Sequence, residues 1–155
     1  MKADMKNPVH LLAFGFGTGL APMAPGTFGT LVGIPCFWVM EDLPPLGYLL
    51  VVAVLFAAGI WLCGKTSRDL GVHDHGGIVW DEIVGLLVTL FGVPFQLSVV
   101  LVGFVLFRFF DILKPWPIGW LDRRVSGGFG VMVDDVLAGM FAAAILQLLL
   151  SLNLL

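Results

Sequence analysis

Four long runs of the sequence contain no charged residue, and these runs restrict what the chain can fold into. They cover residues 7–40, 43–64, 83–107 and 136–155. A helix that crosses the hydrocarbon core of a bilayer needs about 20 apolar residues. Of the 155 residues, 59% are hydrophobic and 12% are charged, whereas a soluble domain has about 25% charged residues. The sequence therefore predicts an integral membrane protein with one domain, residues 1–155.

Glycine and proline divide the apolar runs into helices. The Gly-Val-Pro turn at 92–94 separates two of them, because proline cannot continue a helical hydrogen-bond ladder. The stretch 15–30 has too many glycines and prolines for a regular helix, so the first embedded segment spans or re-enters the membrane. We expect an all-α, polytopic membrane bundle with about five embedded helices, at 28–40, 46–64, 78–91, 95–113 and 136–155.

The lysines and arginines predict which side of the membrane each connection faces. They gather in the segments 65–80 and 114–135, whereas the connection at 41–45 carries only acids. Cytoplasmic loops are rich in Lys and Arg, so we expect these two segments and the N-terminus to be cytoplasmic. The connections at 41–45 and 92–94 and the C-terminus then lie outside. Most of the charge, and with it the candidate chemistry, is on the cytoplasmic side.

Several other functions are disfavoured by composition and motif context. A net charge of −3 argues against a nucleic-acid partner. Cys36 and Cys63 lie in apolar runs and suggest neither a disulfide framework nor a zinc site. The P-loop pattern at 59–66 lies in a helical apolar run rather than after a strand, which favours a helix end at the interface. His73 and His75 are as readily solvated loop residues as metal ligands.

Paired carboxylates begin two of the expected helices. Asp81 and Glu82 start the helix expected at 78–91, which at 14 residues is about 21 Å long and too short to span alone. It therefore starts inside the interface or is sheltered by other helices. One such pair can be a solvated cap, favoured by the helix dipole. A second pair, Asp134 and Asp135, together with Asp111, favours a polar cavity on the cytoplasmic side. Converging carboxylates repel each other without a cation, and oxygen ligands suit Mg²⁺.

Basic and hydroxyl side chains near these acids are candidates to bind phosphate. Arg108, Asp111 and Lys114 follow one another at spacings of three and lie near each other on a helix. They form either an ion-pair ladder or an acid flanked by two phosphate-binding cations. The loop at 17–29 is either a plain connector or a cavity lining whose N–H groups receive phosphate oxygens. The candidate substrate-binding residues are Lys114, Arg108, Arg68, Thr18 and Thr27.

Five motifs, taken together, resemble the phosphatidylglycerophosphatase A family. They are NPVHLLAFGFGTGLAP, PGTFGTL, DLGVHDHGGIVWDEIVG, FRFFDILKPWPIGWLDR and GGFGVMVDDVLAG. The motifs occur in the family's order and cover most of the chain. The resemblance implies a multi-pass protein of the bacterial inner membrane that needs Mg²⁺. It also implies removal of the terminal phosphate of phosphatidylglycerophosphate, which gives phosphatidylglycerol. The family's acidic and basic motif positions correspond to Asp81, Glu82, Asp111, Lys114, Asp134 and Asp135.

The resulting hypothesis is metal-assisted hydrolysis of a phosphorylated glycerophospholipid. Asp81, Glu82, Asp134 and Asp135 are the expected metal ligands, and Asp111 is expected close by as a further catalytic acid. The general base and the oligomeric state are left open. The alternative from another class is a small cation or proton carrier that uses the same acids. A carrier predicts acids spread across the membrane depth, whereas the centres of the expected helices carry none.

Overall fold

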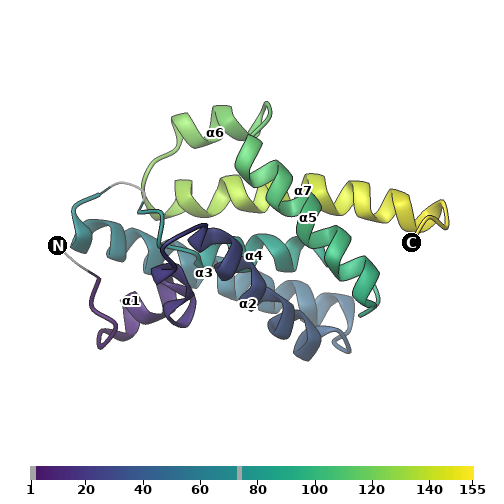
Figure 1. The fold of residues 1–155 in the computed structure, drawn as a ribbon, viewed down its shortest axis with the longest axis horizontal. Helices are drawn as coiled ribbons and strands as arrows, with labels where there is room; N and C mark the ends of the chain where they lie inside the picture. Colours follow the sequence, from purple (N-terminus) through teal and green to yellow (C-terminus); the bar gives the residue numbers. More distant parts are fainter. Residues whose placement is uncertain (1–2, 73–74) are drawn as a thin grey trace.

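The computed structural model describes residues 3–72 and 75–155, and within these ranges it contains helices and no strand. In chain order the elements are α1 (Pro8–Ala13), the 3₁₀ helix η1 (Gly15–Leu20), α2 (Pro25–Met40), α3 (Pro45–Leu70), α4 (Trp80–Thr89), α5 (Leu97–Leu113), α6 (Ile118–Arg124) and α7 (Gly127–Ser151). The long helices α3 and α7 run along the length of the molecule (Figure 1). The all-α prediction is confirmed. His73 lies outside the described residues.

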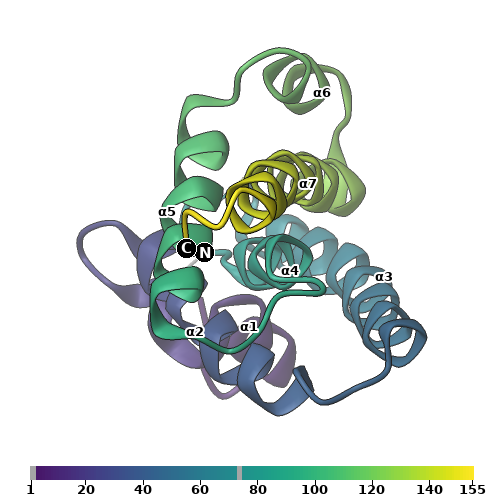
Figure 2. The same ribbon diagram turned by 90° about the vertical axis from the view of Figure 1, so that its right-hand side faces the viewer.

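The short helix α4 forms the centre of the bundle. It packs against α2, α3, α5 and α7, and the view in Figure 2 shows it enclosed by them. Val84, Leu86 and Leu87 on α4 have no exposed surface. Gly85 allows α5 to come close, because a Cβ there would lie 2.5 Å from the ring of Phe107. Of the two possibilities for this short helix, the structure supports shelter by its neighbours.

Two helices of the described chain are long and apolar enough to cross a membrane. These are α3, with 26 residues, and α7, with 25. Both expose large apolar side chains outward, such as Val54 on α3 and Met140 on α7. An apolar outer surface around long apolar helices is what an integral membrane protein requires. The expectation of about five embedded helices remains a prediction.

Two helix boundaries differ from the expected ones where charge was taken to end a helix. Helix α7 begins at Gly127 rather than 136, and α3 continues to Leu70 rather than 64. Helix α2 begins at Pro25 rather than 28, inside the stretch expected to be irregular because of its glycines and prolines. Helix α3 ends only where Gly71 adopts a left-handed conformation with φ 72°. Charged residues do not stop these helices because their side chains reach a pocket or the molecular surface. In addition, α1, η1 and α6 were not expected, α4 and α5 begin two residues later, and α4 ends two residues earlier than predicted.

Most of the connections lie toward two opposite ends of the molecule. The end of α3 and the start of α7 lie at one end, whereas α5 ends between the two, beside α6 (Figure 1). The connections that follow α2 and α4 lie at the other end with the C-terminus. The predicted sidedness, in which 65–80 and 114–135 share one face of the membrane, remains a prediction.

The contact between α3 and α7 depends on Gly128. A Cβ at this position would lie 1.9 Å from the carbonyl oxygen of Ile60 and 2.7 Å from the backbone nitrogen of Gly64. Both neighbours are backbone atoms, so Gly128→Ala forces the helices apart. We expect this variant to lose about 2 kcal/mol of stability and to unfold roughly 5 °C lower in detergent.

The matched control is Gly47→Ala on α3, where the nearest atom would be at an ordinary 3.4 Å. This control should unfold at the same temperature as the unaltered protein, or slightly above it. Circular dichroism measures the unfolding temperature of both variants. If Gly128→Ala and Gly47→Ala unfold at the same temperature, the close contact between α3 and α7 is contradicted.

Candidate active site

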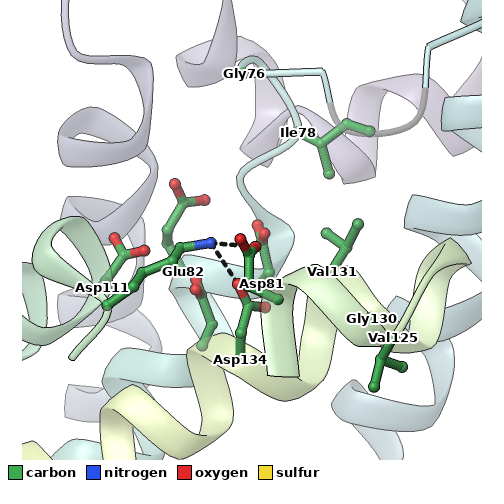
Figure 3. A pocket seen from close by; sticks show the side chains of 12 residues that line it. Gly76, Ile78, Asp81, Glu82, Asp111, Val125, Gly130, Val131 and Asp134 are labelled. Atoms are coloured by element: carbon green, nitrogen blue, oxygen red, sulfur yellow. Dashed lines mark hydrogen bonds and ion pairs between the residues drawn. The ribbon is translucent and has the colours of Figure 1, made fainter. Parts of the chain in front are cut away.

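A polar pocket of about 300 Å³ opens at the end of the bundle where α4 and α7 begin and α5 ends. Figure 3 shows its acidic side chains pointing toward one another from α4, α5 and α7. Its lining contains Lys114 and six carboxylates, which are Asp81, Glu82, Asp111, Asp122, Asp134 and Asp135. Such a concentration of acids in a largely buried site favours the binding of a cation.

Asp81 and Glu82 occupy the first turn of α4. The N-terminal end of a helix favours negative charge, so the backbone stabilises both carboxylates. Asp81 is 9% exposed and the side chain of Glu82 is 13% exposed. These side chains are therefore not the solvated cap that one acidic pair could have formed. The short helix α4 holds them at the floor of the pocket.

Asp134 and Asp135 lie in the second and third turns of α7, not at its start. Consecutive residues of a helix point about 100° apart, so the two carboxylates contact different neighbouring residues. An oxygen of Asp135 lies within 4.8 Å of oxygens from both Asp81 and Glu82. Asp134 instead accepts a hydrogen bond of 2.5 Å from Nζ of Lys114.

Three of the four expected metal ligands therefore come together. Each of Asp81, Glu82 and Asp135 offers one oxygen to a group that spans 4.8 Å or less, a size that a metal ion can bridge. Among the described residues, Oε2 of Glu82 and Oδ2 of Asp135 are buried without a hydrogen-bond partner. Buried carboxylate oxygens without a donor are costly, and a hard cation would satisfy them. The donor set fits a metal ion, while Asp134 lies outside this group.

Lys114 connects the acids of α7 to the helix α6. It caps α5 in a left-handed conformation with φ 43°, and its Nζ donates to Asp134 at 2.5 Å and to Asp122 at 2.6 Å. Burial lowers the pKa of Lys114, but these two bonds outweigh burial and raise the pKa above its usual value. The hydrogen bond from Lys114 in turn holds the pKa of Asp122 below its usual range. Lys114 therefore stays charged in the wall of the pocket.

Arg108 lies behind the pocket rather than in its lining. Its guanidinium pairs with Asp111 and lies 3.6 Å from Oε1 of Glu82. Helix α2 closes over this pair at Gly26, where a Cβ would lie 2.2 Å from Oε1 of Glu82 and 3.1 Å from the Arg108 guanidinium. Arg108 and Asp111 thus form an ion pair, the first of the two alternatives, and Arg108, a candidate substrate ligand, does not line the pocket. In this position Arg108 balances and orients Glu82.

The remaining predicted substrate ligands lie away from the pocket lining. Arg68 borders a separate hollow with Gly64 and Ser67, on the far side of the first turn of α7. The hydroxyl of Thr18 donates to the carbonyl oxygen of Gly15 at 2.8 Å, within its own turn. Thr27 lies in the first turn of α2, next to Gly26 but outside the lining. None of these three residues lines the acidic pocket.

One lining residue, Asp122, was missed in the sequence. It belongs to α6, a helix of seven residues between charged segments that lacks an apolar run of its own. A signal was present, because Asp122 and Lys114 have opposite charge and flank the Pro-Trp-Pro turn. The opposite charges alone do not predict that Asp122 lies in the pocket, because this depends on the chain folding back across the pocket.

Together, the fold and the pocket define an all-helical protein with two helices that could span a membrane and a carboxylate site that could hold a metal ion. The sequence profile of the phosphatidylglycerophosphatase A family matches residues 11–150. The chain therefore belongs to the phosphatidylglycerophosphatase A family, as its motifs suggested. No solved structure matches it.

Its curated relatives match over nearly their whole length. Phosphatidylglycerophosphatase A of Escherichia coli (strain K12) is 51% identical over 146 residues, which cover 94% of this chain and 85% of the relative. The protein of the same name from Haemophilus influenzae is 48% identical over 148 residues, covering 93% and 90%. A protein of Bacteroides thetaiotaomicron, provisionally named a phosphatidylinositol-3-phosphatase, is 39% identical over 149 residues, covering 89% and 92%.

Proposed function

We propose that this protein hydrolyses the terminal phosphomonoester of phosphatidylglycerophosphate and releases phosphatidylglycerol and inorganic phosphate. The observation that carries the proposal is the 51% identity to a phosphatidylglycerophosphatase A along almost the entire chain. The pocket supports it, because buried acids beside a permanently charged lysine suit a phosphoryl group and a cation. The acids gather at one end of the bundle instead of spreading along it, which favours an enzyme over a cation or proton carrier.

Asp81, Glu82 and Asp135 are the proposed ligands of a Mg²⁺ ion. Their oxygens fit a hard cation in type and spacing. When bound, Mg²⁺ would supply Lewis-acid stabilisation of the charge on the phosphoryl oxygens. Asp134 contributes differently in this proposal, by holding Lys114 in the wall of the pocket.

Lys114 is proposed to orient the phosphoryl group. An ammonium has three N–H donors, and the carboxylates of Asp122 and Asp134 accept from two of them. The third is then available to a phosphate oxygen. A water oxygen attacks phosphorus and gives one proton to a lining carboxylate. The bond between phosphorus and the glycerol oxygen breaks, and that oxygen takes up a proton, from the protonated carboxylate or from solvent, to become the hydroxyl of phosphatidylglycerol. Which lining carboxylate accepts the proton is left open.

In the membrane, we place this pocket at the cytoplasmic face of the bacterial inner membrane. The positive segments 65–80 and 114–135 support this orientation. Five helices, α2 to α5 and α7, are then embedded, with α4 enclosed by the others. The acyl chains of the substrate remain among the lipids, and only the head group enters the pocket.

The test is phosphate release by the purified full chain in detergent micelles. Phosphatidylglycerophosphate, phosphatidic acid and phosphatidylinositol 3-phosphate are offered separately with Mg²⁺. We expect turnover of phosphatidylglycerophosphate to exceed that of the other two lipids. A preparation that moves protons or cations across vesicle membranes but releases no phosphate from any of the three lipids would support the carrier instead.

A further inference from the structure

The short helix α6 has two faces of different character. Ile118 is fully buried, and Asp122, although exposed, accepts a hydrogen bond from Lys114 in the pocket wall, so this face is turned toward the bundle. Trp120, Arg123 and Arg124 are exposed. Residues three and four apart share one side of a helix, so the tryptophan and the two arginines form a single outward face. Figure 2 shows α6 lying outside the bundle, beside α7.

This outward face combines aromatic rings and positive charge. The guanidinium of Arg124 stacks over the ring of Trp120, 5.2 Å from its centroid. Trp116, just before α6, is 82% exposed. Tryptophan favours the head-group level of a bilayer, and arginines there attract anionic lipids. We call the four residues Trp116, Trp120, Arg123 and Arg124 the α6 rim.

The α6 rim lies at the edge of the acidic pocket. Asp122 and Val125, which flank the two arginines in sequence, both line the pocket. A Cβ on Gly119 would lie 3.5 Å from Nη1 of Arg123 and 3.6 Å from Cβ of Lys114, so the two cationic side chains are neighbours. The Arg123 guanidinium also contributes, after Lys114, to the lowered pKa of Asp122. Positive charge therefore continues from the pocket wall to the surface.

We propose that the α6 rim binds the phosphodiester group of the lipid head group. The inference rests on the proposed function, since that substrate carries a terminal phosphomonoester and, one glycerol away, a phosphodiester joined to the acyl chains. With the monoester in the pocket, the diester is left at the mouth of the pocket, near the lipid surface. Arg123 and Arg124 supply the complementary charge there. The rim thus selects lipids that carry a second, anionic phosphate.

Binding of phosphatidylglycerol, which carries the diester and lacks the monoester, tests the rim without any turnover. Native mass spectrometry of the full chain in detergent measures its affinity for phosphatidylglycerol, which has a net negative charge, and for phosphatidylcholine, whose phosphodiester charge is balanced by its own choline ammonium. We expect the double variant Arg123→Gln with Arg124→Gln to bind phosphatidylglycerol roughly tenfold more weakly than the unaltered protein does. Its affinity for phosphatidylcholine should fall by less than about twofold. Arg123→Lys with Arg124→Lys should retain most of the affinity. Lys6→Gln with Lys65→Gln removes the same charge from residues outside the α6 rim and the pocket lining, and should have little effect.

A kinetic measurement separates the rim from the pocket. Inhibition by phosphatidylglycerol should weaken in the Gln variant, whereas inhibition by inorganic phosphate should not change. The proposed role of the α6 rim would be rejected if the Gln variant bound phosphatidylglycerol as tightly as the unaltered protein does. It would also be rejected if the variant lost as much affinity for phosphatidylcholine as for phosphatidylglycerol. An unaltered protein that binds phosphatidylglycerol through these arginines but never releases phosphate would leave the rim standing and reject the proposed function.

Discussion

Replacing Asp135 with asparagine is expected to lower phosphate release roughly a thousandfold. The side chain is 3% exposed, and asparagine has nearly the same shape, so the change removes charge and little else. It weakens one of three converging carboxylates that α4 and α7 contribute together. A metal site that loses an anionic ligand binds its ion less tightly and stabilises less charge in the transition state. The measurement is the initial rate of phosphate release from phosphatidylglycerophosphate in mixed micelles.

The matched control for this variant is Asp42→Asn. Asp42 is an exposed acid in the connection after α2, at the opposite end of the bundle. It should retain the full rate. Asp135→Asn should unfold at the same temperature as the unaltered protein or higher, because removing one of several clustered like charges relieves repulsion. Near-normal turnover by a folded Asp135→Asn protein would remove Asp135 from the site.

Chelation is expected to abolish the activity and to destabilise the fold at the same time. EDTA should reduce phosphate release to background, and added Mg²⁺ should restore it, if Asp81, Glu82 and Asp135 hold the ion. An ion that binds only the folded protein stabilises it by about 2.7 kcal/mol at one hundred times its dissociation constant. Saturating Mg²⁺ should therefore raise the unfolding temperature by several degrees.

Two variants test whether the stabilisation by Mg²⁺ comes from the acidic pocket. In Asp135→Asn the response of the unfolding temperature to Mg²⁺ should largely disappear, whereas Asp42→Asn should respond like the unaltered protein. Differential scanning fluorimetry in detergent records both. Full activity in EDTA, or the same Mg²⁺ response in Asp135→Asn as in the unaltered chain, would contradict a resident ion at this position.

The location of the polar pocket at one end of the bundle could be predicted from the sequence, because burying charge inside a membrane protein is costly. The apolar runs left few places for acids, and the adjacent pair Asp81 and Glu82 at the start of a helix too short to span indicated a sheltered polar site. The structure confirms that α4 is enclosed and that these two acids face the pocket with Asp111.

The different contacts of the adjacent acids Asp134 and Asp135 could not be predicted from their spacing in the sequence. Asp134 and Asp135 are adjacent in sequence, but their roles separate because α7 has already completed its first turn when it reaches them. Their directions depend on where α7 begins, and that start was expected nine residues too late. The charged segment 114–135 was expected to be a connection, whereas α7 already starts within it and Gly128 contacts the backbone of α3.

Two other parts of the site depended on tertiary structure. Arg68 was expected near the phosphate because it shares a side of the membrane with the acids, but α3 extends to Leu70 and carries it to another hollow. Asp122 was missed because it reaches the pocket only when α6 folds across its edge. Sidedness restricts a residue to one end of a bundle, and only packing decides which residues meet there.

Binding of Mn²⁺, followed by electron paramagnetic resonance, tests most directly whether α4 and α7 build one metal site. The spectrum distinguishes free from bound ion without any dependence on turnover. We predict saturable binding by the unaltered chain, lost in Asp81→Asn with Glu82→Gln and in Asp135→Asn. The distant acidic pair supplies the control, so Glu41→Gln with Asp42→Asn should bind as the unaltered chain does. Equal binding by all four proteins, or no saturable binding by any, would contradict the metal site.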